Sequence, residues 1–150
     1  FDGTSWTEIT DVNTGRQNSG GAGTQDAALF FGGQTPPGAV HTETETWNGI
    51  SWAEGNDLNT ARHDAMEAGA TATAALFFGG AEIPAGLTES YNGTSWTEVA
   101  DTALNYGSGA GSPAGSNVVA LKCGGPNPSP ANTATEEWIV PNEINTVTVS

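Results

Sequence analysis

The chain alternates between short apolar runs and polar segments in a pattern that occurs three times. The apolar runs are residues 27–31, 74–78 and 118–123, and each ends at a Gly-Gly pair. Runs of this length next to glycine are typical of buried β-strands. A segment of the type Thr-Glu-x-aromatic follows each run, at residues 44–47, 88–91 and 135–138. Its alternation of side chains predicts a strand that is exposed on one side.

A hairpin and a tryptophan strand complete the pattern. Asp-Gly or Asn-Gly stands at residues 2–3, 48–49 and 92–93. This is the strongest short hairpin signal, because both central residues of a type I′ turn need a positive φ. The strand predicted after the turn carries Trp6, Trp52 or Trp96, which are 46 and 44 residues apart. The Ala-rich stretch 61–75 contains Gly and Thr and is itself part of the repeat, which argues against a helix.

Four short strands in a period near 45 residues predict an all-β chain built from repeated units. The spacing of Gly32-Gly33, Trp47 and Trp52, and of Gly79-Gly80, Tyr91 and Trp96, resembles the kelch repeat. The resemblance covers essentially the whole chain and implies a kelch-like β-propeller with blades of the galactose-oxidase type. The amino-acid sequence of the repeats is also similar to kelch-like repeats of phages and environmental bacteria, which implies a virion or surface protein.

The repeat divides the chain into one partial and three larger units. Residues 1–11 are the end of a preceding blade, 12–57 and 58–101 are two blades, and 102–150 form a final blade with a divergent C-terminal strand. Propellers typically close with four to eight blades, so about three blades do not close a ring. Either missing sequence completes the ring, which we favour, or a second chain does so head to tail. In the second case residues 4–10 complete the last blade of the other chain.

Composition narrows the class of protein. The chain has 150 residues, with 17 Asp and Glu against 3 Lys and Arg, and a net charge of −14. This excludes nucleic-acid binding, which needs clustered Lys and Arg, and a basic membrane-surface helix. The longest apolar stretch of the chain is too short to span a membrane. One cysteine, Cys123, excludes an internal disulfide framework and a Cys-based zinc site. The chain begins at Phe1 without a visible signal peptide, which suggests a processed product or a piece of something longer.

Residues that recur in every unit are expected to serve the fold. We assign the Trp residues to packing between blades. We expect the arginines to bond to a glutamate or a loop carbonyl, and the register-matched Glu45, Glu89 and Glu136 to be structural. The structural set comprises Trp6, Trp52, Trp96, Gly32, Gly33, Gly79, Gly80, Gly124, Gly125, Arg16 and Arg62.

No catalytic residues are predicted. A copper-radical oxidase site is rejected, because Tyr91 takes a repeated core position and Cys123 replaces a repeated phenylalanine on a buried strand. His41 and His63 are expected to be surface residues and not metal ligands. No cofactor is predicted, with a weak possibility of Ca²⁺ in the Asp-containing loops.

The loops that differ between units are the expected site of recognition. Loops 34–41, 81–87 and 126–134 are predicted to lie on one face with the connections 12–15, 58–61 and 102–105. The binding candidates are Gln34, His41, Glu82, Asn59, Asn105, Asn127 and Asn132. We expect a non-enzymatic structural or adhesive module, in a virion, phage tail appendage or extracellular assembly, that recognises a glycan or protein surface. The protein is expected to be a homo-oligomer or part of a larger assembly. The alternative is the C-terminal part of a secreted carbohydrate-active enzyme with catalytic residues mostly outside this chain.

Overall fold

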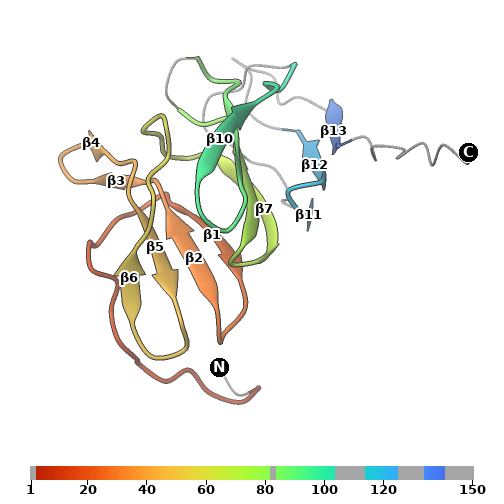
Figure 1. Ribbon diagram of the computed structural model, residues 1–150. Coiled ribbons are helices and arrows are strands. Elements are labelled where there is room, and N and C mark those ends of the chain that lie inside the picture. The colour runs from red at the N-terminus through yellow and green to blue at the C-terminus, as the bar shows by residue number, and fades with distance from the viewer. Residues whose placement is uncertain (1–2, 82–83, 104–113, 125–133, 141–150) are drawn as a thin grey trace, which may run out of the picture.

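The computed structural model describes residues 3–81, 84–103, 114–124 and 134–140, and this part of the chain contains only strands, turns and loops (Figure 1). The prediction of an all-β chain is therefore confirmed. The strands form three antiparallel sheets and one small hairpin. Residues 61–75, which are rich in alanine, contain strand β7 and no helix.

The first two sheets have four strands each, in matching order. The first contains β1 (Gly20–Gly23), β2 (Ala28–Phe31), β5 (Thr44–Trp47) and β6 (Trp52–Glu54). The second contains β7 (Met66–Thr71), β8 (Ala74–Phe78), β9 (Thr88–Tyr91) and β10 (Trp96–Val99). In both sheets the order of the strands in space is their order in the repeat, so one repeat forms one sheet.

The third sheet is shorter in the described residues. It contains β11 (Ala114–Gly115), β12 (Val119–Cys123) and β13 (Thr135–Ile139). The hairpin of β3 (Gln34–Thr35) and β4 (Ala39–Val40) has no counterpart in the sequence pattern and lies between β2 and β5.

Strand pairing gives each sheet two different faces. On the first sheet Ala28, Trp47 and Trp52 are paired across the strands and share a face with Phe30, which we call the aromatic face. Leu29, Phe31 and Thr44 lie on the other side, which we call the leucine face. The register-matched residues make the same two faces on the other sheets, with Ala75, Phe77, Tyr91 and Trp96 on the aromatic face of the second.

The leucine face of the first sheet packs on the aromatic face of the second. The Phe31 ring centroid lies 5.0 Å from that of Phe77 and 4.8 Å from that of Trp96. The indole Nε1–H of Trp96 donates to the Thr44 hydroxyl at 3.0 Å. Phe31, Phe77 and Thr44 are all 0% exposed, so this contact is the main core of the molecule.

The leucine face of the second sheet packs in turn on the third sheet. Leu76 and Phe78 form a second buried cluster with Ala120, and Trp138 lies against it. The three sheets therefore stack in chain order, the aromatic face of each later sheet on the leucine face of the sheet before it. They do not close into a ring within the described residues.

The first strands of the sheets consist largely of small residues where they meet. Strand β1 lies beside β7 (Figure 1). A Cβ atom built on Gly69 would lie 2.8 Å from the Cβ of Ala22, which is too close for a real side chain. The Gly-Ala composition of these strands thus follows from close backbone approach.

The hairpin prediction is correct in position but wrong in turn type. Trp47 pairs with Trp52, which leaves four residues in the loop and not two. Only the glycine has a positive φ, at 92° for Gly49 and 94° for Gly93. The Asn48 side chain instead closes the loop, since its Oδ1 accepts hydrogen bonds from Ile50 N and Ser51 N at 2.9 Å each. This is the local bond by which Asn favours turns.

Two other predictions are wrong. Residues 5–12 form no strand, and Trp6 is 85% exposed, so Trp6 makes no packing between sheets. The segment instead runs along the β6 side of the first sheet (Figure 1), and the Thr10 hydroxyl donates to Ile50 O in the loop between β5 and β6 at 3.3 Å. Strand β12 is not buried on its apolar side: Leu121 is 39% exposed, whereas Lys122 is 4% exposed. The reason is that the third sheet presents its leucine face to no other described strand.

Candidate functional site

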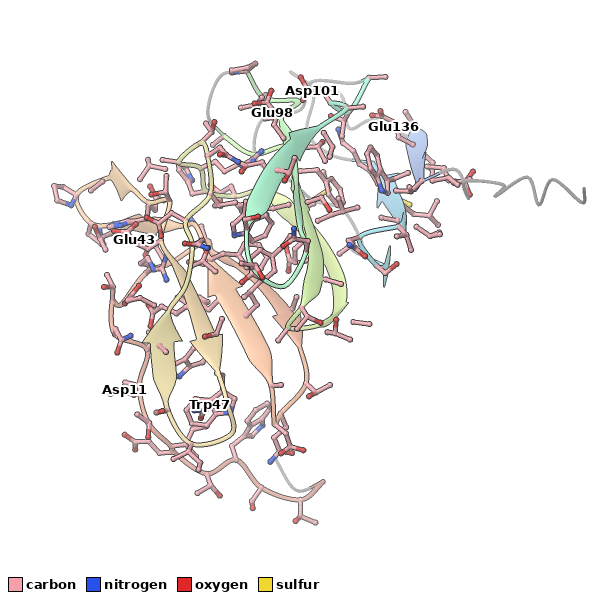
Figure 2. The ribbon with its side chains drawn as sticks, viewed as in Figure 1. Asp11, Glu43, Trp47, Glu98, Asp101 and Glu136 are labelled. Carbon is pink, nitrogen blue, oxygen red and sulfur yellow. The ribbon has the colours of Figure 1, made fainter. Side chains whose placement is uncertain are left out.

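The loops between the second and third strands lie with the connections that lead into each following sheet. Leu58 N donates to Thr42 O at 2.9 Å, and Thr102 N donates to Gly86 O at 2.9 Å. In Figure 2, Glu43 lies near the β3–β4 hairpin, while Trp47 lies toward the other end of the first sheet, near its Asn-Gly loop. We call this end of the molecule, with its loops 34–43, 55–65, 84–87 and 100–103, the loop face.

The Gly-Gly pairs shape the loop face. Gly32 and Gly33 have φ values of 62° and 96°, a region that favours glycine. A Cβ atom on Gly33 would lie 2.0 Å from the Ser19 hydroxyl oxygen. Gly33 N donates to Arg62 O at 2.9 Å, so the pair also joins the first sheet to the start of the second.

Beneath the first loops lies a buried ionic cluster around Arg16 and Glu45. Arg16 Nη2 donates to Glu45 Oε1 at 3.0 Å, and both side chains are 0% exposed. Arg16 Nη1 donates to the carbonyl oxygens of Gly32 and Glu43 at 3.1 and 2.6 Å. Glu45 also accepts from Asn13 N at 2.7 Å. The arginine therefore bonds to both a glutamate and loop carbonyls, as its recurrence predicts.

The second sheet repeats this cluster. Arg62 bonds to Glu89 through Nη2 and to Leu87 O through Nη1, the latter at 2.7 Å. Glu89 accepts from Asn59 N at 2.8 Å and Thr60 N at 3.2 Å. Burial lowers the pKa of the Arg62 guanidinium, and the charge and hydrogen bond of Glu89 oppose that shift. A carboxylate so fully occupied has no free lone pair for a ligand or a proton-transfer step.

The third sheet changes the cation but keeps the carboxylate. Lys122 Nζ lies 3.4 Å from Glu136 Oε1 and donates to the Thr102 hydroxyl at 3.1 Å. In the earlier sheets the arginine lies over the ring of Phe30 or Phe77, the residues that match Lys122 in register. Burial lowers the pKa of Lys122, and the charge and hydrogen bond of Glu136 oppose the shift. In the third sheet the positive charge beside the glutamate is therefore carried by strand β12, whereas in the first two sheets it is carried by the segment that precedes the first strand.

One polar cluster of the loop face has no counterpart in the repeat. His41 Nε2 lies 3.0 Å from the Thr35 hydroxyl, and His41 Nδ1 lies 3.0 Å from Glu43 Oε2. The side chains of His41 and Glu43 are 16% and 41% exposed. Burial alone would raise the pKa of Glu43, but its own backbone hydrogen bond, His41 and Arg16 together lower it. A hydroxyl, an imidazole and a carboxylate are therefore aligned at the edge of the loop face.

The predicted binding residues are placed differently from one another. Gln34 is half-buried at the start of β3, and its backbone pairs with Gln17 in both directions at 2.9 Å. Asn59 is committed to the fold, because its Nδ2 donates to Glu89 Oε2 at 2.8 Å and Trp96 O at 3.1 Å. His63 bonds to Asp64 at 2.9 Å. Five predicted residues lie outside the described part of the chain: Glu82, Asn105, Asn127, Asn132 and Gly125.

Sequence reasoning did not single out Thr35 or Lys122, and it considered Glu43 only as a neighbour of Glu45 and not as a partner of His41. Glu43 stands two residues after His41, and this period of two in an extended segment places both side chains on one side. Lys122 carries a clearer signal. It replaces a repeated phenylalanine in the same unit in which Tyr106 replaces the repeated arginine.

Of the three repeated tryptophans, Trp96 alone packs across sheets. Trp52 is half-buried, with its ring centroid 5.4 Å from that of Trp47 in the same sheet. Packing between two sheets is thus found at Trp96, whereas Trp52 contacts its own sheet.

The described residues hold no group of three or more His, Cys, Asp or Glu side chains that could bind a metal ion. In the same part of the chain no helix is long and apolar enough to cross a membrane.

Comparison with known proteins gives no family for the chain. No family model matches the sequence, and no curated protein matches it at a significant level.

Proposed function

We propose that the three sheets are blades of a kelch-like β-propeller and that the protein is a non-enzymatic binding module. Its ligand is a glycan or a protein surface, bound at the loop face. The setting we propose is a virion, a phage tail appendage or an extracellular assembly, where an acidic and Lys-poor surface is suited to solubility.

One observation carries the proposal: the repeated carboxylates Glu45 and Glu89 are bonded within the fold, while an unrepeated group of polar side chains lies on the loop face. Glu45 and Glu89 are fully buried and bonded by donors of the repeat itself. Thr35, His41 and Glu43 belong to a loop of one unit only and remain partly exposed. Variable loops on a rigid scaffold are where recognition residues concentrate.

Charge restricts the ligand class. With a net charge of −14, the protein repels sulfated or sialylated glycans and acidic protein surfaces at low salt. The charge therefore favours a neutral or positively charged ligand over an acidic one.

A glycan array and a panel of surface proteins test the proposal. Binding to a neutral or basic ligand is expected to fall at least tenfold in His41→Ala and Glu43→Gln. Ile50→Ser is the matched control, because Ile50 is 79% exposed on an Asn-Gly loop at the other end of the first sheet. Binding that is lost in the Ile50 variant and kept in both loop-face variants would refute the proposed site.

A hydrolytic enzyme is the second candidate, and the Thr35–His41–Glu43 alignment favours it. A hydroxyl, an imidazole base and an orienting carboxylate in this order are the groups that activate a nucleophile. Turnover of ester and polysaccharide substrates that disappears in Thr35→Val would support an enzyme. Binding without turnover would support the recognition module.

A further inference from the structure

A cavity lies between the second and third sheets, beside the connection 100–102 of the loop face. Its volume is about 70 Å³. An apolar cavity of about 150 Å³ holds a whole benzene molecule. The cavity between the sheets is therefore large enough for the edge of an aromatic ring, and the rest of such a ligand stays outside it. Its lining comes from both sheets and is partly apolar and partly polar: Leu76, Phe78, Thr88, Ala120, Lys122 and Trp138.

The matching place between the first two sheets shows what fits against this lining. Phe78 of the second sheet matches Phe31 of the first in register. Thr88 likewise matches Thr44. In the first sheet these two residues hold the Trp96 indole, whose ring centroid lies 4.8 Å from that of Phe31 and whose Nε1–H donates to the Thr44 hydroxyl at 3.0 Å. Phe78 and Thr88 therefore offer the same two contacts to a ring that enters the cavity.

The third unit does not supply this ring itself. Trp96 stands five residues after Tyr91, and five residues after the matching Trp138 the sequence has Glu143. Residues 139–150 contain no Trp, Tyr or Phe, and Glu143 lies outside the described residues. The cavity wall thus keeps the contacts for an indole in a unit whose sequence has none at that position.

Lys122 adds a contact that suits an aromatic ring. It takes the register position of Phe77, whose ring centroid lies 5.0 Å from that of Phe31. Its Nζ donates to the hydroxyl of Thr102, which also lines the cavity, so the positive charge lies at the cavity wall. A cation beside the face of an aromatic ring is attracted by the quadrupole of the ring. The change from phenylalanine to lysine therefore exchanges one partner of an aromatic ring for another.

We propose that this cavity binds the edge of an indole ring, the side chain of a tryptophan that a partner protein presents at the loop face. The ring lies against Phe78, its N–H donates to the Thr88 hydroxyl, and Lys122 lies at its face. The Thr88 hydroxyl donates to Gly86 O at 3.4 Å, and its oxygen has lone pairs that accept a further hydrogen bond. Because the cavity holds only part of the ring, the rest of the ligand must be held outside it, which favours a side chain of a protein over a free small molecule.

The inference rests on the proposed binding function and adds a second site to the loop face, apart from His41. Glu136 also lines the cavity, and Figure 2 shows it well apart from Glu43. An indole is neutral, so the net charge of −14 does not oppose its binding.

Paired changes in the ligand and in the protein test the N–H contact. The probes are N-acetyl-tryptophanamide, its analogue methylated at the indole nitrogen, and N-acetyl-cyclohexylalaninamide, each titrated into the chain and followed by NMR of the Phe78 and Lys122 amides. The parent is expected to bind the tryptophan probe about fivefold more tightly than the methylated one, because methylation removes the donor. In Thr88→Val this ratio should fall to about one, since the acceptor is then absent. The cyclohexyl probe, which has no π face for Lys122, should bind the parent about threefold more weakly than the tryptophan probe.

Two variants serve as controls. Thr46→Val removes an exposed hydroxyl of the first sheet, outside the cavity, and should keep the fivefold ratio of the parent. His41→Ala should also keep it, because His41 belongs to the other site. The comparison of probes in the parent needs no variant to fold.

Three results would overturn the indole site. They are no saturable binding of the tryptophan probe up to about 20 mM, the same ratio of affinities in the parent and in Thr88→Val, and loss of probe binding in His41→Ala. A glycan or protein that still binds through His41 and Glu43 would then leave the proposed function intact.

Discussion

Removal of the Glu89 carboxylate tests whether the repeated acids are structural. Glu89 accepts hydrogen bonds from Asn59 N, Asn59 Nδ2, Thr60 N and Arg62 Nη2. In Glu89→Ala the Arg62 side chain, 2% exposed, keeps its charge but loses its bonded carboxylate, and only the weaker interactions with Asp101 and Glu98 remain. Loss of one partner of a buried pair costs about 3–5 kcal/mol.

The third sheet supplies a matched control for this change. Glu136 is 20% exposed, and Lys122 also donates to the Thr102 hydroxyl at 3.1 Å. Glu136→Ala is therefore expected to cost about 1–2 kcal/mol, the range of a partly solvated charged hydrogen bond.

Urea unfolding measures both variants. With a slope of about 2 kcal/mol per molar urea, Glu89→Ala is expected to lower the midpoint by about 2 M and Glu136→Ala by less than about 1 M. Glu89→Gln keeps acceptors for the backbone N–H groups, so it should fall between the two and serves if Glu89→Ala does not fold. A double-mutant cycle with Arg62→Met should give a coupling of about 1–3 kcal/mol. Equal and small losses in Glu89→Ala and Glu136→Ala would refute a structural role for the buried carboxylate.

Two further predictions concern single side chains. Thr44→Val is expected to lower the free energy of unfolding by about 1–3 kcal/mol, because it leaves the buried Trp96 indole N–H without an acceptor. Thr46→Val is the control, since the hydroxyl bond to Ala53 O that it removes is exposed, and its thermal melting should change little. Equal losses of stability in the two variants would contradict the role of the Thr44 hydroxyl. Burial raises the pKa of Glu67 above its ordinary 4.5, so the native state holds this proton more tightly and stability falls as pH rises above that value. Glu67→Gln should therefore melt at a higher temperature than the parent at pH 7 and at the same temperature as the parent near pH 4. Glu98→Gln, at an exposed position, should melt at the parent's temperature at both pH values. A Glu67 variant that is stabilised equally at both pH values would contradict the burial argument.

The sequence pattern predicts those parts of the molecule that recur. Strands β8, β9 and β13 begin at Ala74, Thr88 and Thr135, as the aligned runs predict. The Arg16–Glu45 pair follows from the register of the repeat. The arginine and the glutamate have matching partners in the first two sheets, so their role could be inferred from their recurrence.

Features whose neighbours are set by tertiary contacts or by strand pairing escape this reasoning, whether or not the residues recur. The exposure of Trp6 depends on which strand lies beside it, and repetition alone says nothing of that. The four-residue turn at Asn48 depends on the pairing of Trp47 with Trp52. The contacts of His41 depend on the β3–β4 hairpin, a two-residue pairing too short to give a periodic signal.

The first two sheets pack face to face through Trp96, which belongs to the second sheet. Hydrogen exchange of the indole N–H groups, followed by NMR, tests this packing most directly. The Trp96 indole is 5% exposed and bonded to Thr44, so it should exchange as slowly as the amides of the core strands. The same indole in the chain unfolded by urea should exchange within the dead time. A Trp96 indole that exchanges as fast in the folded chain as in the unfolded chain would contradict the packing of the sheets described here.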